Sequence, residues 1–356
     1  MKHRKYKYLI IGAGLSGLTA GYQLSKSGEE DYLILEARDR IGGRILTDNQ
    51  IDMGATWFQG HHTVLASLLL ELGISSFGQY RKGQSVLVYS TMAPAHHFES
   101  DQSSEPAKRI SGGSAALINR LVRYSNGKVL LNAPVDQITK NENAIEIKTS
   151  DGLISADYVM IAFPPRLASL MVFDPPLPSA LTQVMSSTHT WMSNAIKIGL
   201  TFEHPFWREN GLSGMVIGQT GPVVELYDHT DHEEQTFSLM GFINEALRKE
   251  SFSNRQERIL NFLAAQLGPE VRSYTSYQEK DWSQDPHTAD ANLDSIYMSP
   301  QYGNPIFDEA YWGSRLFLSG AETALVHGGY MDGAVRSGIQ TVERMLKAST
   351  ANPQSI

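Results

Sequence analysis

A glycine-rich turn near the start of the chain limits its fold more than any other feature of the sequence. The residues GAGLSG at positions 12–17 follow an apolar β-like run, 6–11, and open a helical pattern at 15–25. In such a turn the first glycine permits a tight bend, the second lets the backbone approach a pyrophosphate, and the third lets helix and strand pack closely. Free N–H groups at the helix start can bind the phosphates. We therefore expect dinucleotide contacts from Gly12, Ala13, Gly14, Ser16 and Gly17.

An acidic residue follows this strand, turn and helix at the position where a dinucleotide-binding unit contacts a ribose. Glu36 ends the next β-rich run, 32–36, at about the 20-residue spacing at which an acid accepts hydrogen bonds from ribose hydroxyls. The alternative is a solvated strand end without a ligand. Strand, turn, helix, strand and acid in the right order favour the nucleotide site, and an acid at this position argues against a 2′-phosphate, and so against NADP.

Composition excludes several classes of function. The 356 residues suggest about two domains. The net charge is −8 and no run of Lys or Arg occurs beyond the first seven residues, so we expect no nucleic-acid partner. The chain has no cysteine, which excludes disulfides, thiolate metal sites, a catalytic thiol and a flavin attached through sulfur.

The N-terminus imitates a secretory signal but lacks its features. Basic residues 1–8 run into apolar residues 9–11, which the glycine turn interrupts at once, and no cleavage-like motif follows. No apolar segment approaches the ~20 residues that span a bilayer. These patterns predict a cytoplasmic protein without a membrane partner.

Apolar runs beyond the opening unit predict two groups of strands. The first group, ended by Pro164 and Pro165, comprises residues 129–131, 135–139, 144–149 and 158–162. The second predicts a mostly antiparallel unit with strands at 195–202, 213–217, 223–227, 237–243 and 271–278 and a helix at 255–267. Further expectations are helices at 64–72, 112–121 and 333–346, a strand at 316–319, and a loop in the polar tract 96–108.

From Glu36 onward the chain resembles the flavin amine oxidases, the family that contains monoamine oxidase, polyamine oxidase and L-amino acid oxidase. EAR at 36–38 with GGR at 42–44 resembles the family's extended FAD fingerprint, and DMGATW at 52–57 resembles the segment beside the flavin ring. GGS at 112–114, AFPP at 162–165 and FDPPL at 173–177 also match. The resemblance implies FAD contacts from Ala37, Arg38, Gly43, Arg44, Gly54, Ala55, Thr56, Trp57 and Val135.

The C-terminal part continues the resemblance. GAET at 320–323 and GGYMDGA at 328–334 match the family's second FAD motif and the helix start that faces the flavin. N–H groups there would stabilise charge on the reduced flavin. A glycine-rich helix cap without a ligand is the alternative. The residues implied are Gly320, Glu322, Gly329, Tyr330 and Met331.

Three residues are implied to take part in catalysis. Lys197, in the strand pattern AIKI, resembles the lysine that holds a water against flavin N5, and Trp282 resembles the tryptophan beside it. Tyr330 resembles one wall of an aromatic cage around the amine, where cation–π attraction also suits a charged amine. The alternatives are a snorkelling surface lysine and a tyrosine buried in the core.

The sequence departs from the family pattern at several places. The opposite cage wall falls at Asn292, and the site of a flavin-tethering cysteine falls at Ala291, which points to non-covalent FAD. The segment between Trp57 and Gly112 is too short for the family's large helical substrate subdomain. We expect the adjacent pairs His61–His62 and His96–His97 to be solvated, and no metal site.

The predicted fold is α/β, with a Rossmann-like, glutathione-reductase-like FAD domain and an inserted α+β substrate domain of mostly antiparallel strands. The FAD domain comprises 1–76, 109–183 and 283–349, the substrate domain 77–108 and 184–282, and 350–356 is a tail. The implied enzyme oxidises an amine C–N bond to an imine and returns the electrons to O₂; its oligomeric state is left open. The alternatives are an FAD dehydrogenase or desaturase acting on a C–C bond of an apolar substrate, and a non-catalytic flavin-binding protein.

Overall fold

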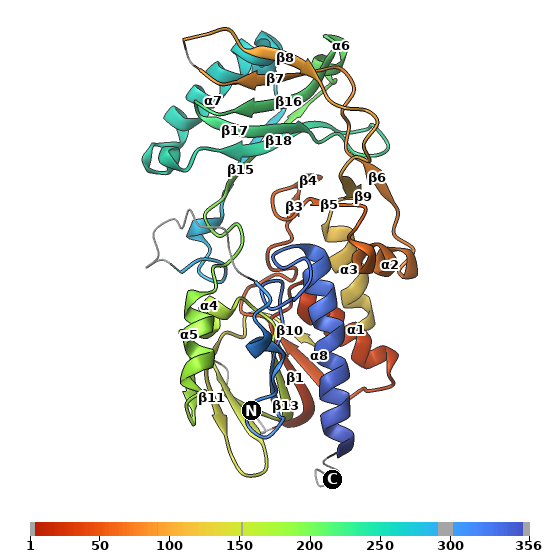
Figure 1. Ribbon diagram of the computed structural model, residues 1–356, viewed down its shortest axis with the longest axis vertical. Helices are drawn as coiled ribbons and strands as arrows, with labels where there is room; N and C mark the ends of the chain where they lie inside the picture. The colour runs from red at the N-terminus through yellow and green to blue at the C-terminus, as the bar shows by residue number, and fades with distance from the viewer. Residues whose placement is uncertain (1–3, 91, 151, 291–301, 352–356) are drawn as a thin grey trace.

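A computed structural model describes residues 4–90, 92–150, 152–290 and 302–351. Two large β-sheets lie one above the other along the longest axis of the molecule (Figure 1). Helices α1 (Leu15–Lys26) and α8 (Met331–Ala351) pack together beside the first sheet, and the second sheet carries α7 (Phe252–Leu267). This arrangement confirms the predicted α/β class.

The first sheet has parallel strands at its centre and an antiparallel extension. Its order is β10-β2-β1-β13-β12-β11-β14, with β20 also paired to β13. Tyr8, Leu9 and Ile10 of β1 are fully buried, as expected for a parallel strand covered on both faces. The strands are β1 (Arg4–Ile11), β2 (Tyr32–Leu35), β10 (Val129–Leu130), β11 (Val135–Lys140), β12 (Ile145–Thr149), β13 (Gly152–Ile161), β14 (Val172–Asp174) and β20 (Leu316–Leu318).

The second sheet is antiparallel except for one pair of strands. Its order is β19-β15-β18-β17-β16-β7-β8, and only β16 and β7 run parallel among these strands. β7 and β8 come from the short segment before Gly112, so this segment extends the second sheet. The strands are β7 (Gln84–Val88), β8 (His96–Glu99), β15 (Ile196–Phe202), β16 (Leu212–Gly218), β17 (Val223–Asp228), β18 (Phe237–Ile243) and β19 (Ser276–Asp281).

Helix α7 shows how the sequence forms the core of this sheet. The Ser251 hydroxyl accepts the Asn254 N–H and caps the helix start. Ile259, Leu260, Leu263 and Leu267 lie on one face and are buried in the cluster that includes Trp207. Gly268, with φ of 112°, and the proline after it end the helix.

Shorter elements connect the two sheets. β3 (Thr47–Asp48) pairs with β4 (Ile51–Asp52), and β9 (Lys108–Ile110) pairs with β5 (Trp57–Phe58) and β6 (Ser76–Gly78). The remaining helices are α2 (Thr63–Glu71), α3 (Ala115–Tyr124), α4 (Pro165–Ala168), α5 (Ser179–Ser187) and α6 (Phe206–Glu209), with 3₁₀ turns at Glu245–Lys249, Pro269–Arg272, Trp282–Gln284 and Pro305–Asp308.

A few expected elements differ from the structure. The strand expected at 271–278 begins only at Ser276, because Pro269 starts a 3₁₀ turn that runs to Arg272. The polar tract expected to be a loop contains β8, which pairs with the buried strand β7. The helix expected at 112–121 starts three residues later, after Gly112 and Gly113 at positive φ. α8 extends to Ala351, two residues into the expected tail.

Among the described residues, no helix combines the length and the apolar character that crossing a bilayer requires.

Replacing Gly17 by alanine should destabilise the first βαβ unit. A Cβ at this position would lie 1.9 Å from the Gly12 carbonyl oxygen, which only a backbone shift can relieve. We expect a loss of about 1–3 kcal/mol, measured as a lower urea midpoint. Gly14→Ala is the matched control, because a Cβ there meets nothing within 4 Å. Equal stability of the two variants would contradict this close packing.

Candidate active site

One cavity of about 730 Å³ collects most of the residues that the sequence singled out. It extends from the glycine turn to β15 of the second sheet, so both sheets contribute to its walls. Ala13 and Gly17 are the predicted residues that do not line it. Those that do are Gly12, Gly14, Ser16, Glu36, Ala37, Arg38, Gly43, Arg44, Gly54, Ala55, Thr56, Trp57, Val135, Lys197, Trp282, Gly320, Glu322, Gly329, Tyr330 and Met331.

The glycine turn has the shape that a pyrophosphate needs. Gly12 has φ of 109°, and a Cβ on it would lie 2.8 Å from the Ala162 carbonyl oxygen. Gly14 caps α1 without a side chain, and a Cβ there would meet nothing, because this residue faces the cavity. No acidic residue lies in the first turn of α1, so its N–H groups present positive potential to the cavity. These features fit FAD.

Glu36 is buried immediately after β2, beside the glycine turn. Its side chain is 3% exposed and accepts the Ala13 N–H at 2.8 Å and the Arg38 N–H at 3.0 Å. These bonds fix the carboxylate beside the turn.

Both predicted arginines use their guanidinium groups on protein acids. Arg38 donates to both oxygens of Asp285, at 2.8 and 3.3 Å, and to the Thr288 hydroxyl. Arg44 donates to both oxygens of Glu322, at 2.5 and 2.8 Å. Glu322 therefore lines the cavity with a carboxylate that is already bonded to Arg44.

Lys197 is fully enclosed, which excludes the alternative of a snorkelling surface side chain. Its amino group donates to the carbonyls of Asp52 at 2.7 Å and Gly54 at 2.8 Å, and to the Thr56 hydroxyl at 2.8 Å. Burial lowers its pKa to about 7, with the charge of Asp52 opposing the shift. The amino group therefore holds the segment 52–56 against β15.

Trp282 holds the same segment from the adjoining strand end. It is 3% exposed, its indole N–H donates to the Met53 carbonyl at 2.8 Å, and its backbone N–H donates to the Ala195 carbonyl. Since Met53 lies between two acceptors of Lys197, the two side chains act on neighbouring peptide groups.

Tyr330 lies at an accessible part of the cavity. It is 46% exposed, which excludes a core tyrosine, and its ring centre lies 6.3 Å from Trp191 and 5.1 Å from His62. Trp191 also lines the cavity, and the sequence interpretation missed it. An aromatic residue six positions before Lys197, in an otherwise polar segment, was the available signal.

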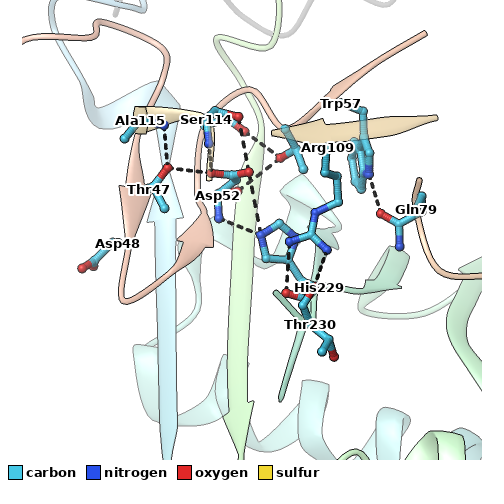
Figure 2. Close-up of polar contacts among 12 residues, drawn as sticks. Thr47, Asp48, Asp52, Trp57, Gln79, Arg109, Ser114, Ala115, His229 and Thr230 are labelled. Carbon is cyan, nitrogen blue, oxygen red and sulfur yellow. Dashed lines mark hydrogen bonds and ion pairs between the residues drawn. The ribbon is translucent and has the colours of Figure 1, made fainter. Parts of the chain in front are cut away.

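Figure 2 shows a cluster of polar groups around Asp52, the residue whose backbone carbonyl accepts a hydrogen bond from Lys197. The Asp52 carboxylate accepts from the Thr47 hydroxyl at 2.6 Å and the Ser114 N–H at 2.9 Å, while its backbone N–H donates to His229 Nε2 at 3.0 Å. Arg109 donates to the carbonyls of His229 and Thr230. Burial raises the Asp52 pKa and lowers the His229 pKa, so the histidine is neutral.

Glu225 differs from the other acidic residues that line the cavity, Glu36 and Glu322, each of which is paired with an arginine. It comes from β17, opposite Phe242 of β18, and its carboxylate accepts a hydrogen bond from the Tyr227 hydroxyl at 3.0 Å. Within the described part of the chain it forms no ion pair. A cationic group of a ligand could therefore pair with it.

The expectation that His61 and His62 are both solvated is wrong. His62 is 1% exposed, caps α2 and lines the cavity, and burial lowers its pKa to about 4. Adjacent residues cannot share one helix face, but this pair lies in a turn, and His327 approaches it from a distant loop. His96 and His97 are exposed on β8.

Two expectations fall outside the described residues. Ala291, the position for a flavin tether, and Asn292, the position of the opposite cage wall, lie in the stretch 291–301.

The buried Lys197 should make stability depend on pH. Its pKa is about 7 in the folded chain against 10.5 as the ordinary value, so between these values the unfolded chain binds the extra proton and stability rises with pH. From pH 7 to 10, wild type should gain about a few kcal/mol relative to Lys197→Met, read from urea midpoints. The exposed Lys82→Met is the control, and a pH-independent difference would contradict the shifted pKa.

Comparison with known proteins agrees with this geometry. The family model for flavin containing amine oxidoreductases matches residues 15–90 and 82–346. The chain is 27% identical over 461 residues to a probable flavin-containing monoamine oxidase A of Dictyostelium discoideum, covering 98% of each. It is 23% identical to putrescine oxidase of Kocuria rosea, covering 96% of this chain and 95% of that one.

A solved structure of wild-type putrescine oxidase bound to putrescine is also similar. The TM-score is 0.84 at 25% identity, covering 97% of this chain and all of the other. The family model covers far more than half of the chain and confirms both the family and the catalytic class predicted from sequence. The chain belongs to the flavin-containing amine oxidoreductases, and it is an FAD-dependent enzyme that oxidises amines.

Proposed function

We propose that this enzyme oxidises a small primary amine to an imine, holds FAD without a covalent bond, and passes the electrons to O₂. One observation carries the proposal: a single cavity joins the glycine turn at one end to Lys197, Trp282 and Tyr330 at the other. A nucleotide-binding turn and a partly apolar, aromatic region in one continuous space suit a dinucleotide whose reactive ring meets a small substrate.

The cofactor-binding residues follow from this arrangement. Gly12, Gly14 and the first turn of α1 would bind the pyrophosphate, and Glu36 would accept hydrogen bonds from ribose hydroxyls. Val135 would contact the adenine. Ala13 and Gly17 would act indirectly, since Ala13 fixes Glu36 and Gly17 permits the close turn. Arg38 and Arg44 would contribute positive potential that their acid partners partly offset.

Bound FAD would supply the redox chemistry, which is acceptance of a hydride equivalent from the C–H bond beside the amine nitrogen and transfer of two electrons to O₂. Lys197 would fix the segment 52–56 that faces the reacting atoms. All three of its bonds end on protein atoms, so a water at Lys197 would have to replace one of them. The Thr56 hydroxyl is the only side chain among these acceptors and can rotate away.

Tyr330 and Trp191 would orient the amine. Both rings line the cavity, and their 46° inclination leaves two aromatic faces around the same space. Aromatic faces attract an ammonium and accommodate the neutral amine that must form before oxidation.

A diamine is the substrate that best fits the charges in the cavity. Glu225 lines the same cavity as Lys197 and forms no ion pair within the described chain, so a second ammonium of the substrate could pair with it. The similarity to a putrescine oxidase structure supports this choice. We also propose a cytoplasmic location and the two-domain division predicted from sequence, with β7 and β8 in the substrate domain.

The purified enzyme should show the visible spectrum of oxidised flavin, which should bleach on anaerobic addition of putrescine. Readmission of air should restore the colour and release peroxide. Acid denaturation should separate the flavin from the protein, since the chain has no cysteine to attach it. Bleaching without peroxide would overturn O₂ as acceptor, and colourless protein that takes up no FAD would overturn the cofactor assignment.

Glu225→Gln should distinguish diamine from monoamine substrates. The amide keeps the shape and removes the charge, so KM for putrescine should rise about tenfold while KM for butylamine stays unchanged. Glu233→Gln, at an exposed glutamate, is the matched control. Equal effects on both amines would show that Glu225 has no part in recognising the second ammonium.

A further inference from the structure

Three imidazole rings converge beside the cavity, from two segments far apart in the sequence. His61 and His62 precede α2, and His327 lies in the loop before α8. One ligand nitrogen from each lies within 4.8 Å of the others, and the ring centres are 4.7, 4.7 and 5.0 Å apart. We propose that these three histidines bind a divalent transition-metal ion of the Zn²⁺ class, in a site next to Tyr330.

His327 is oriented as a metal ligand should be. Its Nδ1 donates to the Asp332 carboxylate at 2.7 Å, which leaves Nε2 as the ring nitrogen that can face a metal ion. Asp332 is fully buried and is itself held by the Leu65 N–H at 2.8 Å and Arg336 Nε at 2.6 Å. His327 also has φ of 55°, an uncommon backbone conformation that aims its side chain at the other two rings.

The other two histidines provide a fixed ligand and a movable one. His62 is buried and neutral, and its ring lies 5.1 Å from that of Tyr330. Its Nδ1 accepts the Gln59 N–H at 3.2 Å, a long bond that ion binding must break or replace. Because metal–nitrogen bonds of about 2.0–2.1 Å bring the nitrogens within about 3.5 Å, the cluster must tighten by about 1 Å. His61 is exposed and can make that movement.

The surrounding charges do not forbid a cation. Arg336 is a positive group that acts on the cluster, and its charge is offset by Asp332, to which it is bonded. Three imidazole ligands with an open fourth position suit Zn²⁺, Co²⁺ or Ni²⁺ far better than Mg²⁺ or Ca²⁺, which prefer oxygen ligands. His62 lines the same cavity as Lys197 and the glycine turn, but the cluster shares no residue with either of them.

Occupancy should affect the entry of substrate. This second part depends on the proposed amine substrate: a dication beside Tyr330 repels a substrate that approaches as an ammonium. We expect Zn²⁺ to raise KM for amines several-fold and leave kcat nearly unchanged, with full reversal by EDTA.

Calorimetric titration of the untagged, EDTA-treated holoenzyme with ZnCl₂ tests the site directly. We expect one Zn²⁺ per chain, and at least tenfold weaker binding in His61→Ala and in His327→Ala. His61→Ala is the milder change, because that side chain is exposed, and it should keep normal turnover in EDTA. The double variant His96→Ala/His97→Ala removes an adjacent exposed pair outside the cluster and should bind as wild type does.

Absence of one-to-one binding, or equal binding by wild type and His61→Ala, would overturn the metal site. Binding with no change in KM would overturn only the effect on substrate entry. Because calorimetry needs no turnover, failure of the metal site is distinguishable from failure of the proposed amine substrate.

Discussion

The burial of one amino group links the two halves of this molecule. Lys197 extends from the second sheet, and its three acceptors all lie in the segment 52–56, which belongs to the first half of the chain. A buried amine without partners is costly, so these bonds fix the distance between the sheets at one point. Trp282 adds a bond to Met53 in the same segment. The cavity lies along this contact, and its shape depends on these few bonds.

Most of the fold was predictable because its signals are local. The glycine turn, the acid at Glu36 and the alternation of apolar runs each depend on residues close together in the chain, and the structure has the expected elements there. The predicted element boundaries were wrong at two places. The strand expected from residue 271 starts later because Pro269 begins a 3₁₀ turn, and part of a polar tract expected to be a loop forms β8 because it pairs with β7. Positions such as Val135 line the cavity, but their cofactor contacts stay predictions.

The site was less predictable, because its contacts join residues that are far apart. Asp52 and His229 are 177 positions apart, and His62 and His327 are 265 apart. The spacing argument correctly excluded two histidines on one helix face, yet it could not anticipate a third ring from another loop. Glu225 was missed for a similar reason, since nothing in its neighbours shows that it faces a cavity, and the one local signal for Trp191 was an aromatic residue in a polar segment. The resemblance to the family named residues that contact the flavin in its members. Trp191 and Glu225 are not among the residues that it named.

Charged residues are paired at the nucleotide end of the cavity and unpaired toward the second sheet, where the substrate would bind. At the nucleotide end, Arg38 and Arg44 are each bonded to a carboxylate, and these ion pairs fix the walls of the cavity. Toward the second sheet, Lys197 and Glu225 line the cavity without an ion-pair partner in the described chain. A charge already neutralised by protein gains little from a ligand, whereas an unpaired one in a poorly solvated space gains much. Among the charged residues of the cavity, those of the second sheet should therefore decide selection among amines, together with the rings of Tyr330 and Trp191. The charged residues beside the first sheet should decide retention of the cofactor.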